Sequence, residues 1–141
     1  RACADRGAAA LLALSWDGTV EMKPSDRVAE EILDQVRAHQ QGEKGMGVAL
    51  GPRAPEVTAA AFRAAGMEVR TAQTPWRLSG AGDGMLMRAL VEGWVSAAAE
   101  IAPERAREFR AWFDTQTPAL SSGRVEITVG HTDLLALPEP R

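Results

Sequence analysis

The sequence predicts an α/β fold, because strand-like segments alternate with longer segments of helical periodicity. Ala8–Ser15 is an apolar run closed by a serine, and Asp17–Gly18 follows as a turn signal. A continuous rather than alternating run is typical of a strand buried on both faces of a parallel sheet. A buried helix segment is the alternative, and the flanking glycines favour the strand. Residues 124–129 alternate polar and apolar, which predicts a second kind of strand near the other end of the chain.

The first half of the chain contains two predicted helices around a loop. Residues 1–7 are typical of a short helix end closed by Gly7. Pro24–Ser25–Asp26 opens a helix that runs to about Gln41, with apolar residues at helical spacing and Gly42 as its C-cap. Residues 42–54 are rich in glycine and show no periodicity, so they predict a loop. Pro55 starts a helix that Gly66 ends.

The second half begins with a predicted strand at Met67–Thr71. A flexible loop over Gly80–Gly84 precedes a strong helix at residues 85–101. Pro103 begins a further helix, predicted to end near Thr117–Pro118. The last strand starts at Arg124 and continues to Leu137, past a predicted bulge at Gly130. We expect all of this to form a single domain.

Composition excludes several classes of protein. The net charge of −3 and the pI of about 5.4 argue against a nucleic-acid binder, which needs a clustered basic face. Cys3 is the single cysteine, so a disulfide framework is excluded within one chain and a reducing cytoplasm is expected. The longest apolar run is far shorter than the roughly 20 residues of a membrane-spanning helix. We therefore expect a cytoplasmic protein without a membrane or nucleic-acid partner.

Four segments of the chain resemble an uncharacterised bacterial branch of the class I S-adenosylmethionine (SAM) dependent methyltransferases. The resemblance covers nearly the whole chain, and the glycine-rich segment is its most specific part. The four segments are Leu12–Gly18 (Leu-Ala-Leu-Ser-Trp-Asp-Gly), His39–Pro52 (His-Gln-Gln-Gly-Glu-Lys-Gly-Met-Gly-Val-Ala-Leu-Gly-Pro), Thr74–Leu78 (Thr-Pro-Trp-Arg-Leu) and Val129–Ala136 (Val-Gly-His-Thr-Asp-Leu-Leu-Ala).

The resemblance implies a Rossmann-like, seven-stranded methyltransferase sheet, of which this chain supplies the C-terminal half with its flanking helices. Ala8–Ser15 corresponds to the fifth strand, Gly66–Thr71 to the sixth and Val125–Leu137 to the seventh, which runs antiparallel between the other two. The family binds SAM through a glycine-rich loop and an acidic ribose-binding residue that lie upstream of these segments. The resemblance thus implies that SAM is bound mainly by residues absent from this chain, which also opens without an initiator methionine.

Two functions follow as expectations. The first is SAM-dependent methyl transfer to an unknown acceptor, expected to be a small molecule, with this chain supplying the substrate-side half and being inactive alone. In that reaction, most of the catalytic effect is expected to come from holding the acceptor in line with the methyl group. The alternative is a non-enzymatic interaction module of the same fold. A half-sheet exposes a strand edge, so a chain of 141 residues is expected to form a homodimer or strand-swapped oligomer through Leu11–Leu14.

Six residues are candidates for substrate binding. Trp16 and Trp76 follow strands at the sheet edge where open α/β sheets bind ligands, although ordinary rim packing is the alternative for both. His39, with the adjoining Gln40, leads into the glycine-rich loop that the resemblance places over the acceptor pocket. Lys44 and Gly45 belong to that loop. Lys44 is either a charged contact to the substrate or a solvated surface charge. Gly45 is either part of a hinge or an ordinary turn residue.

Other motifs have simpler explanations. Gly80–Gly84 reads Gly-x-Gly-x-Gly, but it lacks the preceding buried strand and the acidic residue about 20 positions later that a nucleotide loop requires. His131 lies inside a predicted strand and is expected to make a structural hydrogen bond. Asp17 is either a substrate contact or the first residue of an Asp-Gly turn, and the turn is the favoured interpretation. The sequence predicts no catalytic residue, no cofactor-binding residue and no metal ligand in this chain.

Overall fold

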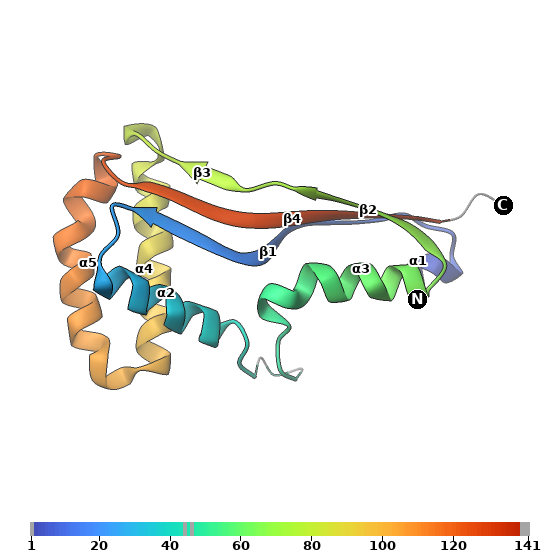
Figure 1. Ribbon diagram of the computed structural model, residues 1–141, viewed down its shortest axis with the longest axis horizontal. Helices are drawn as coiled ribbons and strands as arrows, with labels where there is room; N and C mark the ends of the chain where they lie inside the picture. The colour runs from blue at the N-terminus through green and yellow to red at the C-terminus, as the bar shows by residue number, and fades with distance from the viewer. Residues whose placement is uncertain (1, 44, 46, 139–141) are drawn as a thin grey trace. The chain divides into compact units, whose positions relative to one another are not determined.

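The computed structural model describes residues 2–43, 45 and 47–138 and shows an α/β fold (Figure 1). Its sheet has four strands: β1 (Ala10–Lys23), β2 (Met67–Gln73), β3 (Trp76–Leu78) and β4 (Glu126–Pro138). The strand order is β1-β4-β2, with β3 also paired to β4. β4 is therefore the central strand, and it runs antiparallel to its neighbours.

β2 and β3 behave as one interrupted strand. Gln73 lies opposite Thr132 of β4, and Trp76 lies opposite Val129, so both strands keep the same register. Thr74 continues the ladder, because its amide donates to the carbonyl of His131 at 2.9 Å. Pro75 has no amide hydrogen to donate, which accounts for the break.

Five α-helices and three short 3-10 turns complete the structure. The helices are α1 (Ala2–Asp5), α2 (Arg27–His39), α3 (Ala54–Ala64), α4 (Gly84–Ile101) and α5 (Ala106–Ser121). The turns η1 (Gly51–Arg53), η2 (Ala81–Asp83) and η3 (Pro103–Arg105) lead directly into α3, α4 and α5. Among the described residues, no helix combines the length and the apolar character needed to cross a membrane.

The chain divides into two compact units, which we describe separately. Unit 1 is built from Arg1–Thr19, Leu50–Pro75 and Gly130–Arg141, and unit 2 from Val20–Ala49 and Trp76–Val129. In sequence terms, unit 2 consists of two insertions into unit 1. β1 and β4 each contribute residues to both units.

Unit 2 has a dense apolar core between its helices and its strand segments. One face of α4 packs into this core, because its buried residues recur every third or fourth position. They are Gly84, Met87, Val91, Val95 and Ala98. The side chains of Met87, Val91 and Ala98 have no exposed surface, and Phe109 and Leu120 of α5 are equally enclosed. This packing is the main source of stability expected for unit 2.

One carboxylate fixes the start of α2. Asp26 is the N-cap: its Oδ1 accepts the amide of Ala29 at 2.9 Å. Its Oδ2 accepts the indole Nε1 of Trp112, on α5, at 2.9 Å. Asp26 therefore both caps one helix and ties it to another.

An ion-pair network joins the same two helices. Arg105 donates from Nη2 to Glu31 at 2.6 Å and from Nε to Glu108 at 2.7 Å, and its guanidinium lies 5.3 Å from the ring centre of Phe109. Arg27 adds a second cation, 2.7 Å from Glu31. The hydrogen bond from Arg105 lowers the pKa of Glu108, and the hydrogen bonds to Glu108 and then Glu31 raise the pKa of Arg105.

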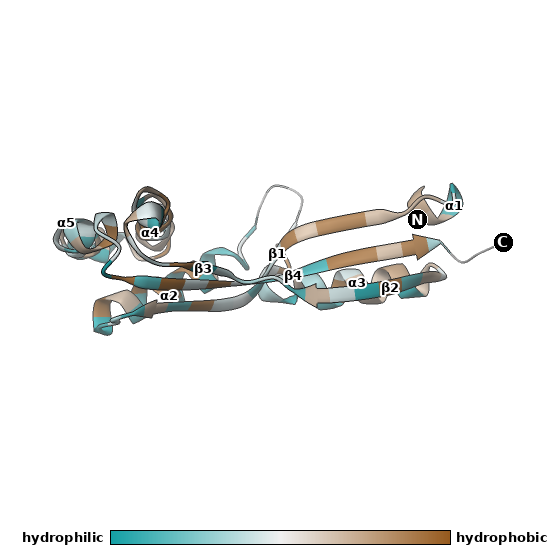
Figure 2. Ribbon diagram, turned by 90° about the horizontal axis from the view of Figure 1, so that it is seen from above, coloured by the Kyte–Doolittle hydropathy of each residue, from teal (hydrophilic) through white to brown (hydrophobic). Residues whose placement is uncertain are grey.

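Unit 1 consists of α1, the first part of β1, α3, β2 and the last part of β4. Its buried cluster is small and holds Ala59, Met67, Leu134 and Ala136, with Phe62 packed against it. Figure 2 shows apolar colouring along the part of β1 next to α1 and along the last part of β4. Much of that surface is open: the exposed fractions are 71% for Leu11 and 52% for Leu14.

The predicted parallel sheet is wrong for the described residues. Because β4 separates β1 from β2, every strand pair is antiparallel, and β1 is an outer strand rather than an interior one. The strand predicted at Ala8–Ser15 begins at Ala10 and runs on to Lys23. It passes through Asp17–Gly18, which was predicted as a turn; Oδ1 of Asp17 accepts the amide of Thr19 at 2.9 Å, but the strand does not reverse there.

Other elements agree with the sequence or extend it. α2, α3, β2 and α4 lie where they were predicted, and Gly7 follows α1 with a φ of 63°. α5 continues past Pro118 to Ser121, since Leu120 is fully buried and holds the last turn. The loop predicted at Gly80–Gly84 is mostly the turn η2.

Gly130 lies within the continuous strand β4. A Cβ at Gly130 would overlap the side chains of Asp17 and Thr19, so the close approach of β1 requires a glycine here.

Candidate functional site

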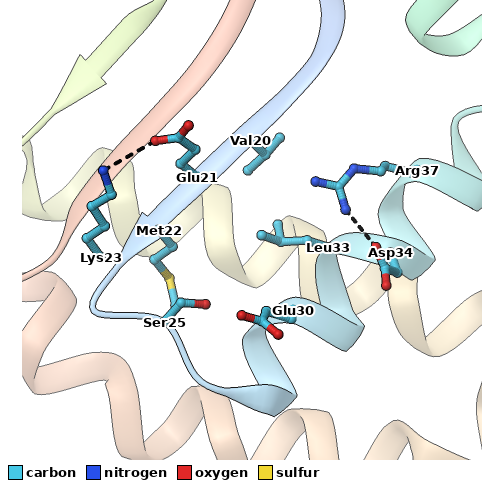
Figure 3. A pocket seen from close by; sticks show the side chains of 9 residues that line it. All are labelled: Val20, Glu21, Met22, Lys23, Ser25, Glu30, Leu33, Asp34 and Arg37. Carbon is cyan, nitrogen blue, oxygen red and sulfur yellow. Dashed lines mark hydrogen bonds and ion pairs between the residues drawn. The ribbon is translucent and has the colours of Figure 1, made fainter.

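A hollow of about 480 Å³ lies in unit 2 between β1 and α2 (Figure 3). This volume lies within the range of small-molecule pockets. Four consecutive strand residues and one face of the helix line it. They are Val20–Lys23 of β1, Ser25 of the connection, and Glu30, Leu33, Asp34 and Arg37 of α2.

The hollow follows the open edge of β1. Successive side chains of a strand point to opposite faces, so four residues in a row can line one space only where that space borders the strand edge. β1 is the outermost strand of the described sheet, and Figure 1 shows α2 on the side of β1 away from β4. The hollow therefore lies beside backbone groups that pair with no described strand.

Its floor is apolar and formed by buried side chains. Val20, Met22 and Leu33 have exposed fractions of only 8%, 6% and 7%, because the same side chains belong to the core of unit 2. Glu21 and Lys23 alternate with them along β1 and stay exposed. A ligand in the hollow would meet hydrocarbon below and charged groups around the rim.

The rim carries two internal ion pairs. Nη1 of Arg37 lies 2.7 Å from Oδ1 of Asp34, and Nζ of Lys23 lies 3.5 Å from Oε2 of Glu21. Glu30 is the remaining charged residue, and no ion pair to it is seen among the described residues. Figure 3 shows Glu30 and Ser25 at one end of the hollow and the pair of Arg37 and Asp34 at the other.

The two tryptophans predicted to contact substrate lie in different units. Trp16, in unit 1, donates from Nε1 to the carbonyl of Thr19 at 3.2 Å. Trp76, in unit 2, opens β3 and is half-buried opposite Val129. Neither residue lines the hollow of Figure 3, and their role in substrate binding stays a prediction.

The predicted loop contacts are held by protein groups. Nε2 of His39, in the last turn of α2, lies 3.0 Å from Oε2 of Glu100 on α4. Gln40 is the exposed C-cap of α2. Glu43 accepts the amides of Gly45 and Gly47 at 2.9 and 2.8 Å, so Gly45 helps to shape the loop. Lys44 lies outside the described residues.

A second polar feature lies on the sheet of unit 1. Leu14 has a φ of 59°, which is rare for a residue with a side chain, and its amide donates to Oδ1 of Asp133 on β4 at 2.8 Å. The carboxylate thus satisfies an amide that the distorted strand turns away from the ladder. His131, predicted to be structural, is buried on the same strand.

Sequence reasoning missed the hollow of Figure 3. In the sequence, the pattern of an amphipathic helix accounts fully for the charged residues Glu30, Asp34 and Arg37. Glu21 and Lys23 lie beside them only because β1 extends as far as Lys23. The one available signal was the alternation of Val20–Lys23, which predicts a strand rather than a turn region. Comparisons of the sequence with models of known protein families and with curated proteins find no match.

Proposed function

We propose that this chain is the C-terminal, substrate-side half of a class I SAM-dependent methyltransferase that acts on a small molecule. The observation that carries the proposal is the strand order β1-β4-β2. In the family that the sequence resembles, the last strand lies antiparallel between the fifth and the sixth. β4 is the last strand of this chain and has that position and direction relative to β1 and β2.

The connection inside unit 1 supports the same proposal. β1 leads through α3 to β2, and the two strands run in one direction on either side of β4. α3 packs on this sheet through Ala59, which contacts the cluster of Met67, Leu134 and Ala136. This is the strand-helix-strand-strand arrangement expected after the cofactor-binding half of the family's sheet. In the proposal, SAM is held mainly by that other half.

Unit 2 supplies a place for the acceptor. In the sequence it begins within β1, at Val20, and resumes at Trp76, shortly after β2. Its hollow has the size and the mixture of apolar floor and polar rim that small-molecule sites have. Methyl transfer needs the acceptor held in line with the methyl group, and a floor of well-packed side chains would serve that purpose.

A second function has its own support. Leu11 and Leu14 are exposed on an outer strand, and such an edge is a template for pairing with another chain. A non-enzymatic module that dimerises through Leu11–Leu14 would account for this surface without any methyl transfer.

Titration with SAM separates the two functions. The complete gene product should bind SAM in calorimetry and transfer a methyl group, whereas the 141-residue chain should bind it negligibly. Sedimentation of both proteins, with Leu11→Lys as a variant of the edge, reports self-association. A complete product that binds no SAM, and that forms dimers sensitive to Leu11→Lys, would overturn the methyltransferase in favour of the interaction module.

A further inference from the structure

We propose that the hollow between β1 and α2 binds an amine: a ligand with one positive charge and a short apolar body. This inference deepens the proposed function, on which it rests for the identity of the amine as methyl acceptor. The binding itself is independent of SAM, because every group that argues for it lies in unit 2 of this chain.

The charge balance of the rim favours a cation. Three carboxylates line the hollow with two cations, which leaves one negative charge in excess. Asp34 and Glu21 already have cationic partners within the hollow, whereas no ion pair to Glu30 is seen in the part of the chain that the structure describes. The excess charge is therefore located on Glu30, at the end of the hollow that also holds Ser25.

An anion fits this surface less well. A ligand carboxylate or phosphate would need Arg37, whose Nη1 is 2.7 Å from Asp34, or Lys23 beside Glu21. Binding would then cost one of these pairs and would leave a rim carboxylate without its cation. An ammonium group at Glu30 breaks no existing pair, and the hydroxyl of Ser25 offers it a further acceptor.

A metal ion is also disfavoured. Hard cations such as Ca²⁺ require six or more oxygen ligands from several converging groups. Within the described residues, no cluster of three or more His, Cys, Asp or Glu side chains has the geometry to hold a metal. One exposed carboxylate is a sufficient partner for an ammonium group, which carries a single charge and three hydrogen-bond donors.

The floor specifies the rest of the ligand. The buried side chains of Val20, Met22 and Leu33 line the hollow. An alkyl or aryl group in contact with them would be stabilised by the removal of apolar surface from water. The open edge of β1 adds unpaired backbone groups, which favour a ligand with an amide or hydroxyl between the amine and the apolar body.

The test uses three matched probes that differ only in the head group: n-hexylammonium, hexan-1-ol and hexanoate. Each is titrated into the 141-residue chain while amide shifts are followed by NMR. We expect hexylammonium to bind most tightly and to shift the amides of Val20–Lys23 and of α2 around Glu30. Tighter binding of hexanoate, binding of no probe, or shifts located elsewhere would overturn the inference.

A pair of variants tests the role of Glu30. Glu30→Gln should weaken hexylammonium about threefold, as expected for a partly exposed charge pair, and should leave hexan-1-ol unchanged. Glu104→Gln is the control, because it removes an exposed charge of unit 2 that does not line the hollow. Equal affinities of the two variants for hexylammonium would contradict the assignment.

The two proposals fail in different ways. If hexylammonium binds but the complete product neither binds SAM nor methylates amines, the amine site stands and the methyltransferase is wrong. If SAM binds but no amine occupies the hollow, the methyltransferase stands and this inference is wrong.

Discussion

The two units differ in how completely they bury their apolar side chains. Unit 2 encloses Met87, Val91 and Phe109 almost fully, whereas the buried apolar residues of unit 1 are the four of its small cluster. Leu11 and Leu14 of unit 1 remain open to solvent. Unit 2 thus buries more of its apolar side chains than unit 1, although Met85, Leu86 and Ile101 of α4 are also exposed. The two hypotheses about function differ in what they expect to cover Leu11 and Leu14 of β1.

The largest expected effect is a loss of core packing in unit 2. Phe109→Ala, at a side chain only 1% exposed, should cost about 3–5 kcal/mol of unfolding free energy. The matched change in unit 1, Phe62→Ala, removes a half-buried ring and should cost less than about 2 kcal/mol. Urea denaturation followed by circular dichroism measures both. Equal losses would show that unit 1 is as well packed as unit 2.

The next effect compares two glycines of α4. A Cβ at Gly84 would overlap the carbonyl oxygen of Ser121, a backbone group that cannot move aside, so Gly84→Ala should cost about 1–3 kcal/mol. Gly93 has no atom within 4 Å of such a Cβ, and Gly93→Ala should stabilise the helix by about 0.5–1 kcal/mol. Thermal melting of both variants reports opposite shifts; a stabilised Gly84→Ala would disprove the close packing of α4 against α5.

The smallest effect is a dependence of stability on pH within unit 2. Arg105 lowers the pKa of Glu108 from its ordinary value of 4.5. Because the folded pKa is the lower one, this contribution to stability is present above 4.5 and is lost as the pH falls through the folded value. Glu108→Gln should therefore reduce the loss of thermal stability between about pH 6 and about pH 3.

The control for this effect is Glu104→Gln, a neighbouring carboxylate without an ion pair among those described. Identical pH profiles for the two variants would show that the network of Arg105 contributes nothing. Both carboxylates lie in unit 2, so no change is expected in the protection of unit 1 amides from hydrogen exchange.

Much of the fold could be predicted because local signals agree with the tertiary structure. The helix start at Pro24–Asp26, the apolar stripe of α4 and the glycine after α1 are short-range features, and their elements lie where the sequence predicted them. The course of β1 could not be predicted from local signals. Asp17–Gly18 has the chemistry of a turn, but the pairing of β1 with β4 outweighs that preference.

The candidate site was harder to predict than the fold. The aromatic and glycine-rich segments of the sequence predicted a site at Trp16, Trp76 and the loop after His39. The rim of the hollow is instead formed in part by exposed charged residues of α2. Such charges have the same appearance in a sequence whether they border a pocket or bulk water. Only the position of α2 beside the edge of β1 distinguishes the two.

The division of β4 between the units has a consequence for synthesis on the ribosome. Every segment of unit 2 precedes Gly130, so its helices and strands can fold before the rest of β4 emerges. Unit 1 waits for the end of β4, and until then β1 and β2 lack the strand that separates them. The nascent chain thus passes through a stage in which unit 2 can be folded while β2 and the unit 1 part of β1 still lack β4, and at this stage a chaperone would be most needed.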